Sequence, residues 1–177
     1  MKKKVVVFSQ IDPEILLRLQ QWYHVVQVHP KQGDVNQQIL AQSRDADGMI
    51  GAGRVLNESN LKHAEKLKVI SSVSVGYDNY DLSYLNQRKI LLTHTPHVLT
   101  ESTADLAFAL LMSAARKVPS LEHWTKQGQW VRTAGPEQFG QDVFGKTLGI
   151  IGLGHIGAAV ARRGFYGFNM NVLYHNR

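Results

Sequence analysis

A glycine pattern near the end of this 177-residue chain limits its fold more than any other feature. The strand-like run Thr147–Ile151 leads into Gly152, Gly154 and Gly157, which have the spacing GxGxxG, and a helical pattern follows directly. In a βαβ unit the first glycine of this spacing permits a tight turn. The second lets the backbone approach a pyrophosphate, and the third lets the helix pack closely on the strand. The N-terminus of that helix adds unpaired N–H groups and a partial positive charge, which favour phosphate.

This spacing is weak evidence by itself, because it requires a strand before it, a helix after it and a second strand about 20 residues further on. All three are present, and the second strand is Asn171–His175. We therefore expect a dinucleotide-binding turn, with a glycine-rich turn that binds no ligand as the alternative. The expected cofactor-binding residues of the turn are Gly152, Gly154, His155, Ile156 and Gly157.

The end of the second strand indicates which dinucleotide is bound. NAD-binding units usually place an acidic residue there to bind the ribose hydroxyls, whereas this chain has Asn176 and Arg177. The missing carboxylate removes a repulsion against a 2′-phosphate, and an arginine can pair with that phosphate. We therefore expect Asn176 and Arg177 to contact the cofactor, and NADP (as NADPH) to be preferred over NAD. The alternative is that Arg177 is only a surface charge.

The first hundred residues alternate short aliphatic runs with helical patterns, which is typical of a doubly wound parallel sheet. The runs are apolar on both faces, as expected for strands that helices cover on both sides. The expected strands are residues 4–8, 24–28, 48–51, 68–73 and 90–93. The sequence thus predicts an α/β chain, with a flavodoxin-like doubly wound parallel sheet followed by the start of a Rossmann NAD(P)-binding domain.

Helices are predicted between these strands and after them. The first has Asp12 as its N-cap and Pro13 at its first position. Its apolar stripe is Ile15, Leu16, Leu19, Trp22 and Tyr23. Further helices are predicted at residues 34–43, 57–66 and 81–88. A longer helix is predicted at 99–117, with Thr100 as its cap. The buried stripe expected for this helix is Leu106, Ala107, Leu110, Leu111 and Ala114, widened by Phe108 and Met112.

The pattern divides the chain into four segments. Residues 1–100 are expected to form a substrate domain, and residues 101–117 a helix between domains. Residues 118–145 show little apolar periodicity, which predicts a surface arm or a linker, and their Trp124 and Trp130 suggest that the segment packs on something. Residues 146–177 are expected to form an incomplete NAD(P)-binding domain, because about 30 residues cannot bury a core of their own.

Composition excludes several classes of protein. The chain has no cysteine, which rules out a disulfide framework and a thiolate nucleophile and agrees with a cytoplasmic protein. The net charge of +6 is spread along the chain rather than gathered into a basic stripe with aromatic residues, so a nucleic-acid partner is not expected. No apolar run approaches the roughly 20 residues needed to span a bilayer, so no membrane association is expected.

Four stretches carry a resemblance to a known family. They are Ser72–Asn79 (SVSVGYDN), His94–Glu101 (HTPHVLTE), the helix Ser102–Lys117 and the glycine pattern itself. In this order they resemble the D-isomer-specific 2-hydroxyacid dehydrogenases, and among these the glyoxylate/hydroxypyruvate reductases, including 2-ketogluconate reductase. The resemblance covers most of the chain and implies NADPH-dependent reduction of a small 2-keto acid to the 2-hydroxy acid.

The resemblance also implies roles for single residues. It places the substrate carboxylate on the amides of Val75 and Gly76, and backbone N–H groups in such a turn do form anion nests. It places Thr103 near the nicotinamide end of the cofactor, where the alternative is simply a small residue in the first turn of a helix. It also implies that the arm around Trp124 and Trp130 embraces a second subunit, so that the intact protein is a homodimer.

The resemblance assigns no catalytic residue within the chain. Family members use an arginine to clamp the substrate, a histidine to donate the proton and a glutamate to orient that histidine, and all three follow the second Rossmann strand. We therefore expect the chain to be truncated and to show little turnover alone. The alternatives are a non-catalytic nucleotide-dependent binding protein of the same fold and an inactive fragment.

Overall fold

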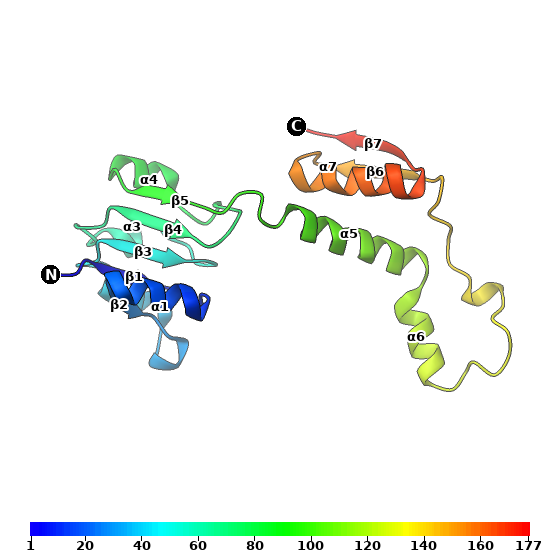
Figure 1. Ribbon diagram of the computed structural model, residues 1–177, viewed down its shortest axis with the longest axis horizontal. Coiled ribbons are helices and arrows are strands. Elements are labelled where there is room, and N and C mark those ends of the chain that lie inside the picture. Colours follow the sequence, from blue (N-terminus) through cyan, green and yellow to red (C-terminus); the bar gives the residue numbers. More distant parts are fainter. The chain divides into compact units, whose positions relative to one another are not determined.

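The computed structural model describes residues 1–177 and divides the chain into two compact units, Met1–Pro96 and His97–Arg177 (Figure 1). The first unit is built on a five-stranded sheet in the order β2-β1-β3-β4-β5, and every neighbouring pair is parallel. The strands are β1 (Lys4–Val7), β2 (His24–Gln27), β3 (Gly48–Gly51), β4 (Val69–Ser72) and β5 (Leu91–Thr93). This is the flavodoxin-like strand order, so the predicted fold class is confirmed.

Aspartate caps begin three of the helices that connect these strands. Asp12 accepts a hydrogen bond from the amide of Glu14, and Asp34 and Asp81 cap α2 and α4 in the same manner. The helices of this unit are α1 (Pro13–Trp22), α2 (Val35–Ser43), α3 (Glu58–Leu61) and α4 (Leu82–Gln87), with a 3-10 turn η1 (Pro30–Gln32). The helix predicted at 57–66 is therefore much shorter than expected, whereas the other three lie where the sequence placed them.

The core of the first unit lies at the centre of the sheet. Val6, Phe8, Met49 and Ile70 are almost fully buried there. Gly51 allows this packing, because a Cβ at that position would come within 2.8 Å of the Phe8 ring. The other buried residues of this cluster are Val28, Ile39, Ala46, Leu56, Leu61, Ala64, Leu67, Tyr80, Leu85 and Ile90.

The apolar stripe of α1 lies largely at the surface. No residue of α1 is buried, and Trp22 keeps 74% of its surface exposed. The helix packs against β2, which is an edge strand with exposed residues at both ends. An edge strand offers too narrow a surface to cover the stripe, so Ile15 and Tyr23 also stay exposed.

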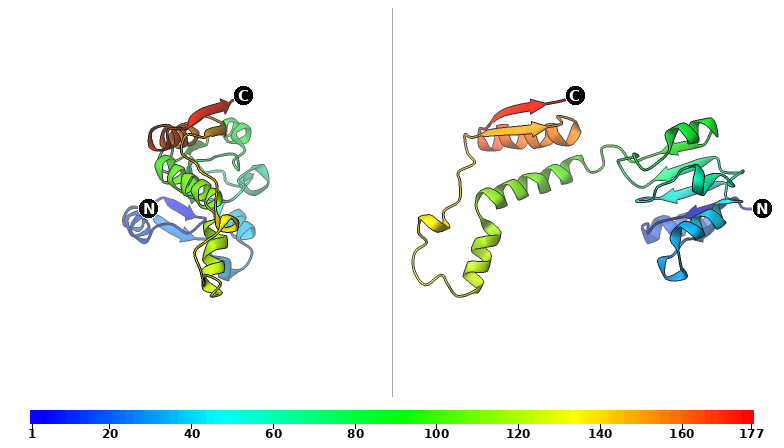
Figure 2. Two further views of the ribbon diagram at one scale, coloured as in Figure 1. Left: turned by 90° about the vertical axis from the view of Figure 1, so that its right-hand side faces the viewer. Right: turned by 180° about the vertical axis from the view of Figure 1, so that it is seen from behind.

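The second unit combines a βαβ unit with a long helix. Strands β6 (Thr147–Ile151) and β7 (Asn171–His175) are parallel and are joined by α7 (His155–Arg162) and a π-helical turn, η3 (Arg163–Gly167). Helix α5 (Thr100–Ala115) lies along α7, as Figures 1 and 2 show from several sides. Between α5 and β6 the chain forms α6 (Val118–Lys126) and a 3-10 turn, η2 (Pro136–Gln138).

Helix α5 buries only part of the predicted stripe, namely Phe108 with Leu111 and Met112 packed beside it. Ala104 and Phe108 are buried, whereas Leu106 and Leu110 are 61% and 60% exposed. Helix α5 contacts α7, and each of the two helices has a fully buried alanine, Ala104 and Ala159. The predicted cap is also wrong, since Leu99 is the N-cap and no side chain caps the helix.

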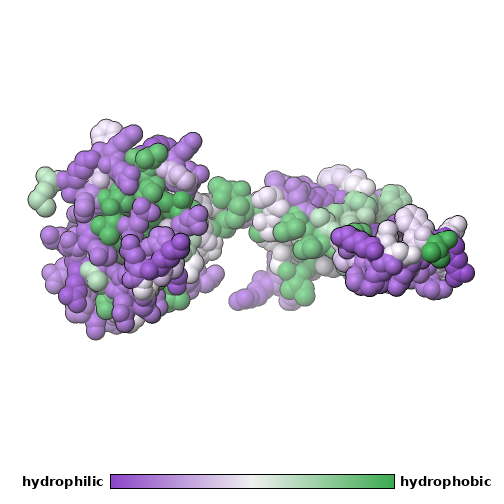
Figure 3. Space-filling view, turned by 90° about the horizontal axis from the view of Figure 1, so that it is seen from below, coloured by the Kyte–Doolittle hydropathy of each residue, from purple (hydrophilic) through white to green (hydrophobic).

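Apolar side chains reach the surface of both units (Figure 3). In the second unit they include Leu106, Leu110, Val118, Trp130 and Phe139. None of the helices combines the length and the apolar character that crossing a membrane would need. The four-segment division predicted from the sequence remains a prediction, and the structure groups α5, α6 and the glycine pattern into one unit.

Candidate functional site

The glycine pattern forms the turn between β6 and α7. Gly152 has a φ of +91°, a left-handed conformation that side chains rarely adopt, so glycine is required there. Gly154 is the N-cap of α7, and no side chain caps this end of the helix. The first N–H groups of the helix are therefore available to a ligand, as in known phosphate-binding turns.

Gly154 and Gly157 have opposite surroundings. A Cβ at Gly157 would collide with the carbonyl oxygen of Gly152, so this glycine is needed for the turn to close on the helix. A Cβ at Gly154 would meet no atom within 4 Å. The open space before Gly154 and the uncapped helix end fit a pyrophosphate. The structure therefore gives these two glycines the separate roles that a dinucleotide turn requires.

The end of β7 is tied to the glycine turn. The amide of Leu153 donates a 2.6 Å hydrogen bond to the side-chain oxygen of Asn176, and the amide of Gly152 donates to the carbonyl of His175. Arg177 follows directly, is exposed and forms no ion pair. The structure thus brings Asn176 to the predicted turn, although its role there is to hold the backbone of Leu153.

His155, at the start of α7, contacts His97, which precedes α5. Their ring centroids are 4.3 Å apart and the rings meet edge to face. His97 itself has a φ of +69°, an uncommon conformation for a residue with a side chain. Two imidazoles therefore lie at the N-terminal end of α7. Thr103 lies in the first turn of α5 and is half-buried, and Ile156 lies in the first turn of α7 and is exposed.

Charged side chains fasten α5 to α7. Arg163 pairs with Asp105 and Glu101, and Arg162 pairs with Glu101 at 2.8 Å. The hydrogen bond to Asp105, helped by the one to Glu101, raises the pKa of the Arg163 guanidinium above its ordinary value. The start of α5, including Thr103, is therefore held against the helix that follows the glycine turn.

A second candidate site is the turn after β4 in the first unit. The amides of Val75 and Gly76 donate no hydrogen bond to any other backbone or side-chain group, so both N–H groups are free to bind an anion. Val75 is half-buried and Gly76 is exposed. This arrangement fits the carboxylate nest that the sequence predicts. A Cβ at Gly76 would meet only the Asp78 carboxylate, at 3.6 Å, so glycine is not required there by crowding.

Contacts from distant residues hold this turn in place. The Nδ1 atom of His94 lies 2.9 Å from the carbonyl oxygen of Val75, and its ring meets that of Tyr77 edge to face. The side chain of Asn79 donates a 2.5 Å hydrogen bond to the carbonyl oxygen of Arg54. Sequence reasoning did not find these roles for His94, Asn79 and Arg54, because the partners are 19 and 25 residues apart and no local pattern joins them.

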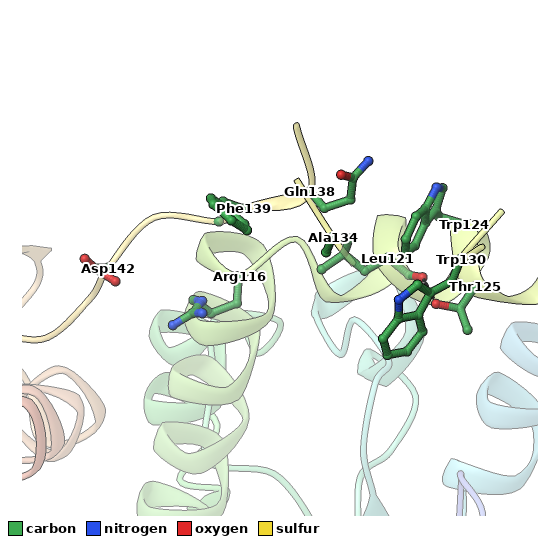
Figure 4. Close-up of a pocket in the computed structure, with 10 residues that line it drawn as sticks. Arg116, Leu121, Trp124, Thr125, Trp130, Ala134, Gln138, Phe139 and Asp142 are labelled. Atoms are coloured by element: carbon green, nitrogen blue, oxygen red, sulfur yellow. Dashed lines mark hydrogen bonds between the residues drawn. The ribbon is translucent and has the colours of Figure 1, made fainter. Parts of the chain in front are cut away.

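The predicted arm closes on itself at its base and contains a cavity. The amide of Gln141 donates to the carbonyl oxygen of Ala115, and a Cβ at Gly140 would collide with that same oxygen. Trp124 and Trp130 stack with their ring centroids 6.1 Å apart (Figure 4). The cavity, of about 550 Å³, is lined by Arg116, Leu121, Trp124, Thr125, Trp130, Ala134, Gln138, Phe139, Gly140 and Asp142.

Comparison with known proteins identifies relatives along the whole chain. Residues 5–168 match the family model described as D-isomer specific 2-hydroxyacid dehydrogenase, catalytic domain. The chain is 41% identical over 177 residues to glyoxylate/hydroxypyruvate reductase B of Citrobacter koseri and 42% identical to the protein of that name in Escherichia coli. These alignments cover 100% of this chain and 55% of each relative, so the chain spans about half the length of the curated relatives it matches.

Solved structures agree with these relatives. A Thermus thermophilus protein superposes with a TM-score of 0.83 at 36% identity, covering 98% of this chain and 56% of that one. The NADPH-dependent glyoxylate/hydroxypyruvate reductase of Sinorhizobium meliloti, solved with NADP and malonate, superposes with a TM-score of 0.79 at 33% identity. That alignment covers 99% of this chain and 53% of the reductase. The chain belongs to the family of D-isomer specific 2-hydroxyacid dehydrogenases.

Proposed function

We propose that the intact protein is a cytoplasmic homodimer that uses NADPH to reduce a small 2-keto acid, such as glyoxylate, hydroxypyruvate or 2-ketogluconate, to the 2-hydroxy acid. The observation that carries this proposal is the turn at Gly152–Gly157, where an uncapped helix end faces open space at Gly154. Bound NADPH would supply the hydride. The relatives named glyoxylate/hydroxypyruvate reductase support the substrate class.

In this proposal the residues of the chain bind and orient the reactants. The N–H groups of the glycine turn and the first turn of α7 bind the pyrophosphate, with His155 and Ile156 at that helix end. Thr103 is assigned to the nicotinamide end of the cofactor. The free amides of Val75 and Gly76 hold the substrate carboxylate, which fixes the position of the neighbouring keto carbon.

NADPH binding tests the cofactor assignment. We expect the chain to bind NADPH more tightly than NADH, because Arg177 can pair with the 2′-phosphate and no acidic side chain at the end of β7 opposes it. Arg177→Ala should weaken NADPH binding about tenfold, the size of one charge-assisted contact of about 1.4 kcal/mol, and should leave NADH binding unchanged. Titration of the cofactor's fluorescence measures both affinities. An equal loss of NADPH and NADH affinity would show that Arg177 does not contact the 2′-phosphate.

Exposed apolar side chains on α5 and the arm support the homodimer. Leu106 and Leu110 face outward on α5, and Trp130 and Phe139 are exposed on the arm. We expect light scattering after size exclusion to give twice the mass of the chain, 19.8 kDa. Replacing Leu106 and Leu110 with glutamate should yield the monomer, since neither side chain contributes to the core. A wild-type monomer at all concentrations would contradict the assignment.

A further inference from the structure

A polar cavity of the first unit lies apart from the Val75–Gly76 nest. It has a volume of about 590 Å³ and is lined by the segments that follow β1, β2 and β3: Ser9 and Gln10, His29 and Pro30, and Ala52 to Arg54. All three strands are parallel, so the cavity lies at their carboxyl ends. The order β2-β1-β3 reverses direction at β1, and ligands of open parallel sheets bind beside such reversals.

Three side chains of this cavity have hydrogen-bonding groups without a partner in the chain. Arg54 is half-buried but forms no ion pair with any acidic residue, and its guanidinium donates no hydrogen bond. The side-chain amides of Gln10 and Gln27 are equally unengaged. By contrast, Ser9 is used to build the wall, because its hydroxyl accepts a 2.9 Å hydrogen bond from the amide of Ala52. The wall of the cavity is thus held by a hydrogen bond, and the side chains of Arg54, Gln10 and Gln27 can still donate to a ligand.

Strand pairing and hydrogen bonds connect the segments that line the cavity to the turn that carries Val75 and Gly76. Gly51 pairs with Ser72 at the ends of β3 and β4, and the amide of Val73 donates to the carbonyl oxygen of Gly51. The Asn79 side chain then joins the far end of the nest's turn to the Arg54 backbone at 2.5 Å. Adjacent strands lie about 4.8 Å apart. The near wall of the cavity is therefore one strand away from the turn that carries Val75 and Gly76.

We propose that this cavity is a subsite for the hydroxylated tail of a longer 2-keto acid, and that Arg54 is the residue that determines specificity there. This inference rests on the proposed function, which places the substrate carboxylate at Val75 and Gly76. Glyoxylate has no atom beyond its reacting carbon and cannot reach the cavity. A 2-keto sugar acid has a chain of hydroxyl-bearing carbons that can.

The chemistry of the wall favours a hydroxylated tail over an alkyl tail. Each glutamine amide both donates and accepts, as a hydroxyl does. The Arg54 guanidinium adds several donors in a fixed plane. Phe8, Val28 and Val35 supply apolar surface for the carbon chain between hydroxyls. An alkyl tail would leave the guanidinium desolvated without a partner, which is unfavourable.

Amide NMR on the full 177-residue chain tests this assignment with three probes. We expect glyoxylate to shift only the amides of Val75 and Gly76. The six-carbon 2-ketogluconate should shift these and also the amides of Ala52–Arg54. The matched six-carbon 2-ketohexanoate, which has no tail hydroxyls, should bind at least tenfold more weakly than 2-ketogluconate.

Variants assign the effect to the guanidinium. Arg54→Met should weaken 2-ketogluconate binding about tenfold and leave glyoxylate binding unchanged, while Arg54→Lys should recover part of the loss. Arg18→Met is the matched control, because Arg18 is an exposed arginine of the same unit that lines no part of this cavity, and it should change nothing. The amide spectrum of each variant also shows directly whether it folds.

Two failures can be told apart. If 2-ketogluconate shifts only the nest, or if 2-ketohexanoate binds as tightly, the subsite is overturned while the proposed function stands. If no keto acid shifts Val75 and Gly76, the proposed substrate site itself fails, and the subsite fails with it.

Discussion

Among the residues of the glycine turn, Gly154 is the one at which a substitution should affect ligand binding without affecting folding. Its backbone is extended, with a φ of −79°, and the space beside it is empty. Gly154→Ala should therefore fold with an unchanged melting temperature. The added methyl group would occupy the place of the pyrophosphate, so we expect NADPH affinity to fall by tenfold or more. Calorimetry and cofactor titration measure the two effects, and an alanine variant that binds NADPH normally would contradict the assigned site.

Gly157→Ala should behave differently, because its Cβ would collide with the backbone of Gly152. The turn must shift, so we expect both a lower melting temperature and a loss of NADPH binding. Gly149→Ala is the matched control, since a Cβ at this β6 position meets nothing within 4 Å. The control should keep both properties. Comparable losses in the two variants would show that the collision is not the cause.

Asp45 gives the first unit a small pH-dependent contribution to stability. The hydrogen bond from Lys4 holds the pKa of this carboxyl below its ordinary value of 3.8. A carboxyl with a lowered pKa stabilises the fold above that ordinary value, and the contribution disappears as the pH falls through the lowered pKa. Asp45→Asn should therefore reduce the free energy of unfolding near neutral pH, but not well below pH 3.8. Since Asp45 is exposed, the effect should be modest, and urea titrations at both pH values can measure it.

At the scale of elements, the α5–α7 pair depends on Arg163. Because the pKa of the guanidinium is raised, the alkaline limit of this pairing lies in strong alkali, and the pairing needs Asp105 and Glu101 as carboxylates. Asp105→Asn removes the main partner and should lower the melting temperature of the second unit at neutral pH. Added salt should reduce the difference from wild type. Glu122→Gln, which breaks an exposed pair within α6, should have little effect.

Local signals in the sequence predicted the elements well. Asp12, Asp34 and Asp81 each cap the helix that they were expected to begin, because a cap depends only on neighbours along the chain. The GxGxxG turn was predictable for the same reason. Burial was harder to predict, since the exposure of the α1 stripe and of Leu106 and Leu110 on α5 depends on which surfaces the fold brings to them. The same limit applies to the Asn79–Arg54 and His97–His155 contacts, whose partners are distant in sequence.

At the scale of the whole molecule, the two units have cores of unequal size. The first buries a cluster of 14 residues and the second a main cluster of only four, around Phe108 and Leu148. Because stability follows buried apolar surface, we expect the second unit to unfold at lower urea concentration. Resolved amide NMR signals of the two units form two sets that can follow each transition separately. Coincident transitions for the two sets would contradict this expectation.

The hydrogen bond between Asn176 and Leu153 has a consequence for protein engineering. Asn176 lies at the position expected to distinguish NADP from NAD. Its side chain also accepts a hydrogen bond from Leu153 and so helps to hold the glycine turn. A substitution of Asn176 that changes cofactor preference would therefore also remove the hydrogen bond to Leu153. Redesign of the cofactor preference should therefore begin at Arg177, whose side chain forms no ion pair within the chain, and should keep Asn176.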